Sequence, residues 1–273
     1  MNGATQLVGL IGWPVSHSQS PQMHNAAFAH LGLNWVYVPM PVHPDPISVE
    51  NALKGLRALG FKGVNVTVPH KEAVLPFMDE LSPSAKAIGA VNTLCFLDSG
   101  KVRGENTDAP GFIADLVDHG VDVVKAKALV LGAGGSARAV VYGLLQAGCM
   151  HVTLVNRTLD KAQKLQQDMQ ALFPEAHINV GSIDQAASLI VNCTSLGMGD
   201  KVDQMPWPAE VSFLPHQVIY DLIYNPNPTR LLQKATSDGA TAISGRGMLV
   251  HQGALSFTLW TGKSAPFLVM KGA

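Results

Sequence analysis

Three short polar clusters stand out against the apolar segments in the first part of the chain. They are His17-Ser18-Gln19-Ser20-Pro21, Asn65 to Lys71, and Asn92-Thr93 with Asn106-Thr107-Asp108. Hydroxyls, amides and a lysine ammonium are the groups that would surround a polyhydroxylated, anionic small molecule. Each cluster also has a local interpretation, in which Ser20 caps a helix, Asn92 occupies a turn and Asp108 caps the helix that follows it. The pattern of residue types leaves both interpretations open.

A glycine-rich turn, Gly132-Ala133-Gly134-Gly135-Ser136-Ala137, follows a buried strand expected from Ala126 to Leu131 and precedes a helix that runs to Ala147. This is a GxGxxG/A arrangement between a strand and a helix, and a second strand ends about 20–25 residues further on. We expect Gly132 to permit the tight turn and Gly134 to let the backbone approach a pyrophosphate, which the helix N-terminus would attract. The alternative is a glycine turn that binds no nucleotide.

The end of the next strand, expected from His151 to Val155, indicates which dinucleotide would bind. An NAD site usually places a carboxylate there for the ribose 2′-hydroxyl, whereas an arginine accommodates a 2′-phosphate. Here the strand is followed by Asn156-Arg157-Thr158, with Lys161 one turn into the helix. A planar, permanently charged guanidinium suits a phosphate. The sequence therefore favours NADP.

Short apolar runs alternate with helical patterns along the chain, which is typical of α/β layers with mostly parallel sheets. Besides the strands already named, we expect strands at residues 8–11, 35–39, 63–68, 189–193 and 218–223. Further helices are expected at residues 20–31, 48–59, 159–172, from the cap Asn227-Pro228 to before Gly239, and 247–260. On the strand at 63–68, Asn65 and Thr67 point away from a valine stripe, as at a strand end beside a site or on a half-exposed edge.

Two domains are expected for a chain of 273 residues. We predict a substrate-binding α/β domain with a mostly parallel sheet, made of residues 1–107 plus 245–273. Residues 108–244, which contain the glycine turn, are predicted to form a Rossmann-type dinucleotide-binding domain.

Composition argues against several classes of protein. The formal net charge is −1 and no Lys/Arg run is present, so we expect no nucleic-acid partner. The three cysteines are far apart, and no histidine pair has metal-ligand spacing with a third ligand nearby, so we expect reduced thiols, no metal and a cytoplasmic protein. No run approaches the ~18–20 apolar residues that span a bilayer, so we expect no membrane partner. Residues 7–11 are interpreted as a first strand rather than a signal peptide.

The polar clusters belong to a longer series of motifs that resembles the shikimate dehydrogenase family in order and spacing over nearly the whole chain. The matching segments are Gly12-Trp13-Pro14, His17 to Pro21, His24-Asn25, Asn65 to Lys71, Gly89 to Thr93, Gly104 to Asp108, Asn156 to Thr158, Asn192 to Met198, Asp221 to Pro226 and Gly245 to Gln252. The resemblance implies reversible, NADPH-dependent reduction of 3-dehydroshikimate to shikimate, on the route through chorismate to the aromatic amino acids. It implies a small-molecule partner and leaves a monomer or a homodimer open.

Carried over position by position, the resemblance assigns site residues. Ser18 and Ser20 would hold the substrate carboxylate, and Lys71 would be the proton donor and acceptor. The residues implied for the ring hydroxyls and the wall of that pocket are Thr67, Asn92, Asp108, Gln252 and Tyr224. Those implied for NADP are Gly132, Ala133, Gly134, Gly135, Ser136, Asn156, Arg157, Thr158, Lys161, Thr194, Ile223 and Gly245.

The chemistry of Lys71 and Asp108 agrees with this assignment. Hydride delivery to a ketone leaves an alkoxide, which an ammonium within hydrogen-bond reach can stabilise and protonate. Asp108 is interpreted as a group that binds and orients rather than a proton carrier, and His70 as a structural contact. The alternatives are a relative that acts on quinate with NAD or NADP, and a non-catalytic NADP-binding regulator on the same fold.

Overall fold

The computed structural model describes residues 1–273, and its contacts divide the chain into two compact units. Unit 1 comprises Met1–Gly111 and Leu249–Ala273, and unit 2 comprises Phe112–Met248. The divisions fall inside helices α4 (Asp108–Asp118) and α8 (Arg246–Thr261), a few residues beyond the boundaries expected from the sequence. In α8, Met248 belongs to a core of unit 2, whereas Val250 and Phe257 belong to a core of unit 1.

The sheet of unit 1 has the order β2-β1-β3-β5-β6-β4. Its strands are β1 (Gln6–Gly12), β2 (Trp35–Pro41), β3 (Gly63–Val66), β4 (Glu80–Leu81), β5 (Thr93–Phe96) and β6 (Val102–Glu105). Strand β1 lies parallel to β2 and β3, and β4 lies parallel to β6, whereas β5 runs antiparallel to β3 and β6. The sheet is thus mostly parallel, with one reversed strand beside β3.

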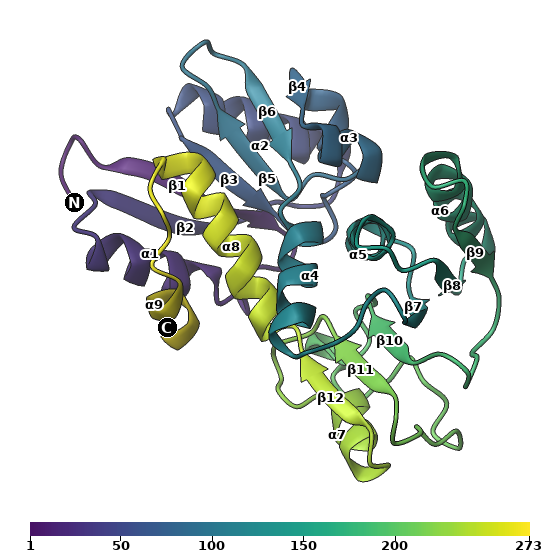
Figure 1. Cartoon of the computed structure of the whole chain (residues 1–273). Helices are drawn as coiled ribbons and strands as arrows, with labels where there is room; N and C mark the ends of the chain where they lie inside the picture. The colour runs from purple at the N-terminus through teal and green to yellow at the C-terminus, as the bar shows by residue number, and fades with distance from the viewer. The chain divides into compact units, whose positions relative to one another are not determined.

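Helices cover both faces of this sheet (Figure 1). On one face, α2 (Pro46–Ala58) packs Val49, Leu53 and Leu56 against Val64 and Val66 of β3. On the other face lie α1 (Ser20–His30), the unit 1 part of α8 and α9 (Phe267–Gly272). Successive strand residues point to opposite faces, so Asn65 faces away from its neighbouring valines and toward α8.

The sheet of unit 2 is parallel throughout, in the order β12-β11-β10-β7-β8-β9. Its strands are β7 (Lys127–Leu131), β8 (His151–Val155), β9 (His177–Val180), β10 (Leu189–Asn192), β11 (Val218–Asp221) and β12 (Thr241–Ser244). Its connecting helices include α5 (Gly135–Gln146), α6 (Leu159–Leu172) and α7 (Arg230–Ser237). The α/β class with a Rossmann-type unit, predicted from the sequence, is confirmed.

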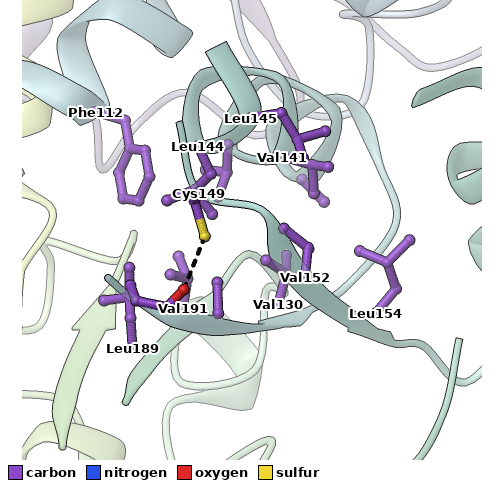
Figure 2. Packing of buried hydrophobic residues seen from close by; sticks show 14 of the residues in the cluster. Phe112, Val130, Val141, Leu144, Leu145, Cys149, Val152, Leu154, Leu189 and Val191 are labelled. Atoms are coloured by element: carbon purple, nitrogen blue, oxygen red, sulfur yellow. Dashed lines mark hydrogen bonds between the residues drawn. The ribbon is translucent and has the colours of Figure 1, made fainter. Parts of the chain in front are cut away.

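Apolar side chains of α4 and α5 pack against those of β7, β8 and β10 in the larger core of unit 2 (Figure 2). Helix α6 adds Ala162, Leu165 and Met169 to this core. Cys149 lies in this core with no exposed surface, and its thiol donates to the Ala126 carbonyl at 3.3 Å. Burial raises the pKa of the Cys149 thiol because the apolar surroundings disfavour a thiolate. The residue therefore acts as a small core side chain rather than a reactive thiol.

Two local expectations were wrong. Ser20 does not cap α1: the N-cap position is Gln19, without a side-chain capping bond, and Ser20 is already the first helical residue. The cap of α7 is Thr229 rather than Asn227, because the Thr229 hydroxyl accepts from the Leu232 N–H at 3.3 Å. No helix in the chain combines the length and the apolar character that crossing a membrane requires.

Candidate active site

Lys71 and Asp108 form a short, largely buried ion pair in unit 1. The Lys71 Nζ atom lies 2.7 Å from Asp108 Oδ2, and the two side chains are 12% and 7% exposed. The other carboxylate oxygen of Asp108 accepts from Asn92 Nδ2 at 2.9 Å. Asp108 is also the first residue of α4, where the helix dipole favours a negative charge. An ammonium is thus aimed and charge-balanced at the edge of the sheet.

The reversed strand β5 brings these residues together. Asn65 of β3 stands opposite Thr93 of β5, and Thr93 stands opposite Glu105 of β6. The start of β5 therefore lies at the same sheet edge as the ends of β3 and β6. Lys71 follows β3, Asn92 precedes β5 and Asp108 follows β6, so all three reach this edge.

Asn92 links the ion pair to α8. Its Nδ2 atom donates to Asp108 Oδ1, to Thr107 Oγ1 at 2.8 Å and to Gln252 Oε1 at 3.3 Å. Its Oδ1 atom accepts from the Thr107 N–H at 2.7 Å. Asn92 lies in a bend just before β5 and is 2% exposed, so its side chain makes these contacts in a buried setting.

The cap of α4 is supplied by Asn106, not by the carboxylate of Asp108. Asn106 Oδ1 accepts from the N–H groups of Asp108 and Ala109 at 3.1 and 3.3 Å. Because Asn106 caps the helix, the Asp108 carboxylate has no capping role and instead binds Lys71 and Asn92. The interpretation of Asp108 as a local helix cap is therefore wrong.

The remaining substrate residues that the resemblance implies follow β1 and β3 or lie in unit 2. Ser18 and Ser20 follow β1, and Ser18 Oγ accepts from the Ser20 N–H at 3.3 Å. Thr67 follows β3, which is in parallel register with β1 through the Ile11–Val66 pair. Tyr224 lies in unit 2, whereas the other implied substrate residues lie in unit 1.

The motif histidines have different surroundings. His70 is 1% exposed and its Nε2 atom lies 2.8 Å from the Val42 carbonyl, so the structural contact expected for it is confirmed. His24 is fully buried, and neither ring nitrogen has a hydrogen-bond partner. Its ring stacks on Tyr37 at 4.5 Å between centroids. Burial lowers the pKa of His24 to about 3, so the imidazole is neutral.

In unit 2, the glycine turn has the shape of a phosphate loop. Gly132 has φ +116°, a region that favours glycine, and its N–H donates to the Val155 carbonyl at 2.8 Å. Gly134 is the N-cap of α5, and a Cβ added there would meet no protein atom within 4 Å. There is therefore open space on the side-chain side of Gly134, next to the N-terminus of α5, which fits a bound pyrophosphate.

Two of the cations near the end of β8 form ion pairs with a carboxylate, and two do not. Arg138 and Lys164 both pair with Asp168, at 2.8 and 2.6 Å. Arg157 and Lys161 are exposed and belong to no ion pair of this kind. Asn156 Nδ2 donates to the Thr158 carbonyl at 2.7 Å and so shapes the short loop that carries Arg157. Two cations remain available for an anionic ligand.

Thr194, Ile223 and Gly245 follow β10, β11 and β12, at the carboxyl edge of the sheet that also carries the glycine turn. Asn192 and Asp221 organise this edge. Asn192 Oδ1 accepts from the hydroxyl of Thr194 at 2.8 Å, and its Nδ2 atom donates to Asp221 Oδ1 at 2.9 Å. Asp221 also accepts from the Ile223 N–H at 3.1 Å. Burial raises the pKa of Asp221 to about 6, although its three donors oppose this effect.

Sequence reasoning did not identify Ser256 as a site residue. It is fully buried, and its hydroxyl lies within hydrogen-bond distance of Asn65, Thr93 and Thr107. The signal was its spacing of one helical turn from Gln252, which places both side chains on one face of α8.

Three family models match the chain. Residues 10–94 match the shikimate dehydrogenase substrate binding domain, residues 115–195 match shikimate / quinate 5-dehydrogenase, and residues 245–273 match the shikimate 5'-dehydrogenase C-terminal domain.

Whole-chain relatives agree with these models. Shikimate dehydrogenase (NADP(+)) of Salinibacter ruber is 46% identical over 97% of this chain and 95% of its own length. The structure of shikimate 5-dehydrogenase from Thermus thermophilus in complex with NADP(H) and shikimate is similar with a TM-score of 0.87, at 38% identity over 98% of each chain. Quinate dehydrogenase from Corynebacterium glutamicum in complex with NAD has a TM-score of 0.84, at 30% identity over 98% of each chain. The chain belongs to the shikimate dehydrogenase family.

Proposed function

We propose that the protein catalyses the reversible, NADPH-dependent reduction of 3-dehydroshikimate to shikimate in the biosynthesis of aromatic amino acids. The observation that carries the proposal is the buried ion pair of Lys71 and Asp108, with Nζ and Oδ2 2.7 Å apart and Asn92 beside it. Carbonyl reduction needs a positioned proton donor, and an ammonium held by a carboxylate and an amide meets that need.

In this proposal Lys71 gives its proton to the oxygen of the reduced carbonyl and takes it back when shikimate is oxidised. Asp108 accepts from a ring hydroxyl and keeps the Lys71 ammonium aimed, while Asn92 and Gln252 bind neighbouring hydroxyls. The hydroxyls of Ser18, Ser20 and Thr67 would bind the carboxylate end and the ring, with Tyr224 as a wall of the pocket. Hydroxyl and amide groups suit this task because each can donate and accept.

NADPH, when bound, supplies the hydride. The N–H groups of the turn from Gly132 to Ser136 would hold its pyrophosphate, and the open space at Gly134 gives the phosphate room. Arg157, with Asn156, Thr158 and Lys161, would hold the 2′-phosphate. Thr194, Ile223 and Gly245 would line the nicotinamide end because they follow strands at the same edge of the sheet.

Steady-state rates with shikimate and quinate, each with NADP⁺ and NAD⁺, test the proposal. We expect the highest kcat/KM with shikimate and NADP⁺. A preference for quinate or for NAD⁺ would identify the rival dehydrogenase, because one extra ring hydroxyl changes the hydrogen bonds of a polar pocket. Tight NADPH binding without turnover of either acid would identify a regulator instead.

Arg157→Ala is expected to weaken NADPH binding by ~1–3 kcal/mol, the scale of a hydrogen bond to a charged group, and to leave NADH binding nearly unchanged. Fluorescence titration with both cofactors measures this difference. The control is Lys164→Ala, which removes a cation of α6 that pairs with Asp168 at 2.6 Å. Equal losses for NADPH and NADH would contradict a contact between Arg157 and the 2′-phosphate.

The cytoplasmic location and the choice between a monomer and a homodimer stay predictions. Size-exclusion chromatography with light scattering measures the second directly.

A further inference from the structure

A buried hydrogen-bond network reaches the Lys71–Asp108 pair through Asn92, whose Nδ2 atom donates to Asp108 Oδ1. Its centre is a group of three hydroxyls, Thr93, Thr107 and Ser256, which we name the hydroxyl trio. Thr93 and Ser256 are fully buried, and Thr107 is 4% exposed. The three oxygens lie 2.8 to 3.3 Å from one another. They come from β5, from the residue before α4 and from α8.

The trio and the Thr107 N–H, which donates to Asn92 Oδ1 at 2.7 Å, together orient the Asn92 amide. Thr93 Oγ1 donates to Asn92 Oδ1 at 3.1 Å, and the Thr107 hydroxyl accepts from Asn92 Nδ2 at 2.8 Å. Because Asn92 Oδ1 is held by the hydroxyl of Thr93, the Nδ2 hydrogens of Asn92 point toward Asp108 Oδ1. The reverse orientation would set the amide oxygen against a carboxylate, which is repulsive at a buried site.

Ser256 holds the trio together and attaches it to α8. Its oxygen accepts from Asn65 Nδ2 at 3.0 Å and lies 2.8 Å from Thr93 Oγ1. Asn65 is fixed in turn because its Oδ1 atom accepts from the Tyr37 hydroxyl at 2.9 Å. The Thr107 hydroxyl has two oxygens of the trio within reach as acceptors, those of Ser256 and Thr93. Without the Ser256 oxygen it keeps one.

Ser256 also contacts the backbone of the turn of α8 that carries Gln252. Ser256 Oγ donates to the Gln252 carbonyl at 3.1 Å, and Gln252 Oε1 accepts from Asn92 Nδ2. The backbones approach closely here, since a Cβ on Gly111 of α4 would lie 2.8 Å from the Gln252 nitrogen. The contacts of Ser256 therefore act on Asn92 and on Gln252 at once.

We propose that Ser256 is a positioning residue for proton transfer, which acts through the hydroxyl trio to hold the Asn92 amide toward Asp108 and Gln252 toward the substrate. This inference rests on the proposed function, in which Lys71, Asn92, Asp108 and Gln252 contact the substrate. Ser256 itself contacts no substrate.

Ser256→Ala tests the inference in steady-state oxidation of shikimate with NADP⁺. We expect kcat to fall roughly tenfold, the effect of about one net hydrogen bond, with a smaller change in KM for shikimate and none in KM for NADP⁺. Ser256→Thr keeps the hydroxyl and is expected to recover most of the lost turnover. A kcat for Ser256→Ala within about twofold of the parent protein, less than a hydrogen bond is worth, would overturn the inference.

Two matched variants separate positioning from loss of stability. Thr258→Ala removes a hydroxyl of α8 that also donates one turn back, to the Ala254 carbonyl at 3.0 Å, but on the exposed face. Phe257→Leu truncates the fully buried neighbour of Ser256 and lowers the melting temperature without touching the trio. Both are expected to keep the parent kcat. A fall in kcat for Phe257→Leu equal to that of Ser256→Ala would assign the effect to packing and overturn the inference.

The parent protein distinguishes the two levels of the proposal. If it does not oxidise shikimate, the proposed function fails. If it does and Ser256→Ala matches it, only the role of Ser256 fails.

Discussion

Replacing Lys71 with alanine is expected to lower the turnover number with shikimate and NADP⁺ by ~10²–10⁴, the range of general acid/base catalysis, with a much smaller change in KM. The physical reason is that the Lys71 ammonium is 12% exposed and held 2.7 Å from Asp108, with Asn92 on the other carboxylate oxygen. Single-turnover reduction followed by NADPH absorbance measures the chemical step separately from product release.

Two further lysine variants show whether the proton or the charge matters. Lys71→Arg keeps a cation that does not give up its proton, so turnover should stay low while part of the substrate affinity returns. Lys101→Ala is the control. It removes an exposed lysine outside the site, whose Nζ atom lies 2.8 Å from Glu80 in an ion pair of nearly the same length as that of Lys71 and Asp108. It should match the parent protein. Near-normal turnover in Lys71→Ala would mean that the proton comes from another group.

The second large effect concerns stability in acid, through His24. Its pKa is about 3 in the folded chain because burial disfavours the imidazolium, against 6.5 for an ordinary histidine. Above pH 6.5 the ring is neutral in both states. Below it the unfolded chain binds a proton that the folded chain does not, so the free energy of unfolding falls by ~1.4 kcal/mol per pH unit, about 3 kcal/mol between pH 6.5 and pH 4.5.

His24→Phe should remove this loss, because a phenyl ring keeps the stacking on Tyr37 and has no site for a proton. It should also remove the cost of two buried ring nitrogens that lack hydrogen-bond partners. The measurement is urea-induced unfolding between pH 7.5 and pH 4.5. His30→Gln, at the exposed end of the same helix, is the control. An unchanged pH slope in His24→Phe would exclude His24 as the acid-sensitive group.

Unit 2 carries a buried group, Asp221, whose effect on stability changes with pH in the opposite direction to that of His24. The unfolding of the two units must therefore be measured separately. The pKa of Asp221 is raised to about 6 from 3.8, so its contribution to stability is present below pH 3.8 and lost as the pH rises through 6. Hydrogen exchange of β1 and α1 reports unit 1, and exchange of β7 and α5 reports unit 2. Only the unit 1 amides should respond to His24→Phe.

The sequence by itself was sufficient for features that depend on neighbouring residues. The turn at Gly132 needs a positive φ, and the strand before it and the helix after it are contiguous in the chain. The α/β class followed from alternating apolar strands and amphipathic helices for the same reason. The cap positions were less certain, because Asn106, Asp108 and Thr229 are all residue types that favour caps, and their competing partners lie elsewhere in the fold.

Only the tertiary structure decided how the site residues meet. Strands β5 and β6 have four residues each, too few for a clear apolar alternation, and their antiparallel pairing is what turns Asn92 and Asp108 toward the end of β3. Asn92 and Gln252 are 160 residues apart, and Thr93 and Ser256 are 163 apart. No spacing along the chain encodes such contacts. They follow from the strand order and from the packing of α8 against the sheet of unit 1. Trp260 of α8 fixes that packing, because its Nε1 atom donates to the Leu94 carbonyl of β5 at 2.9 Å.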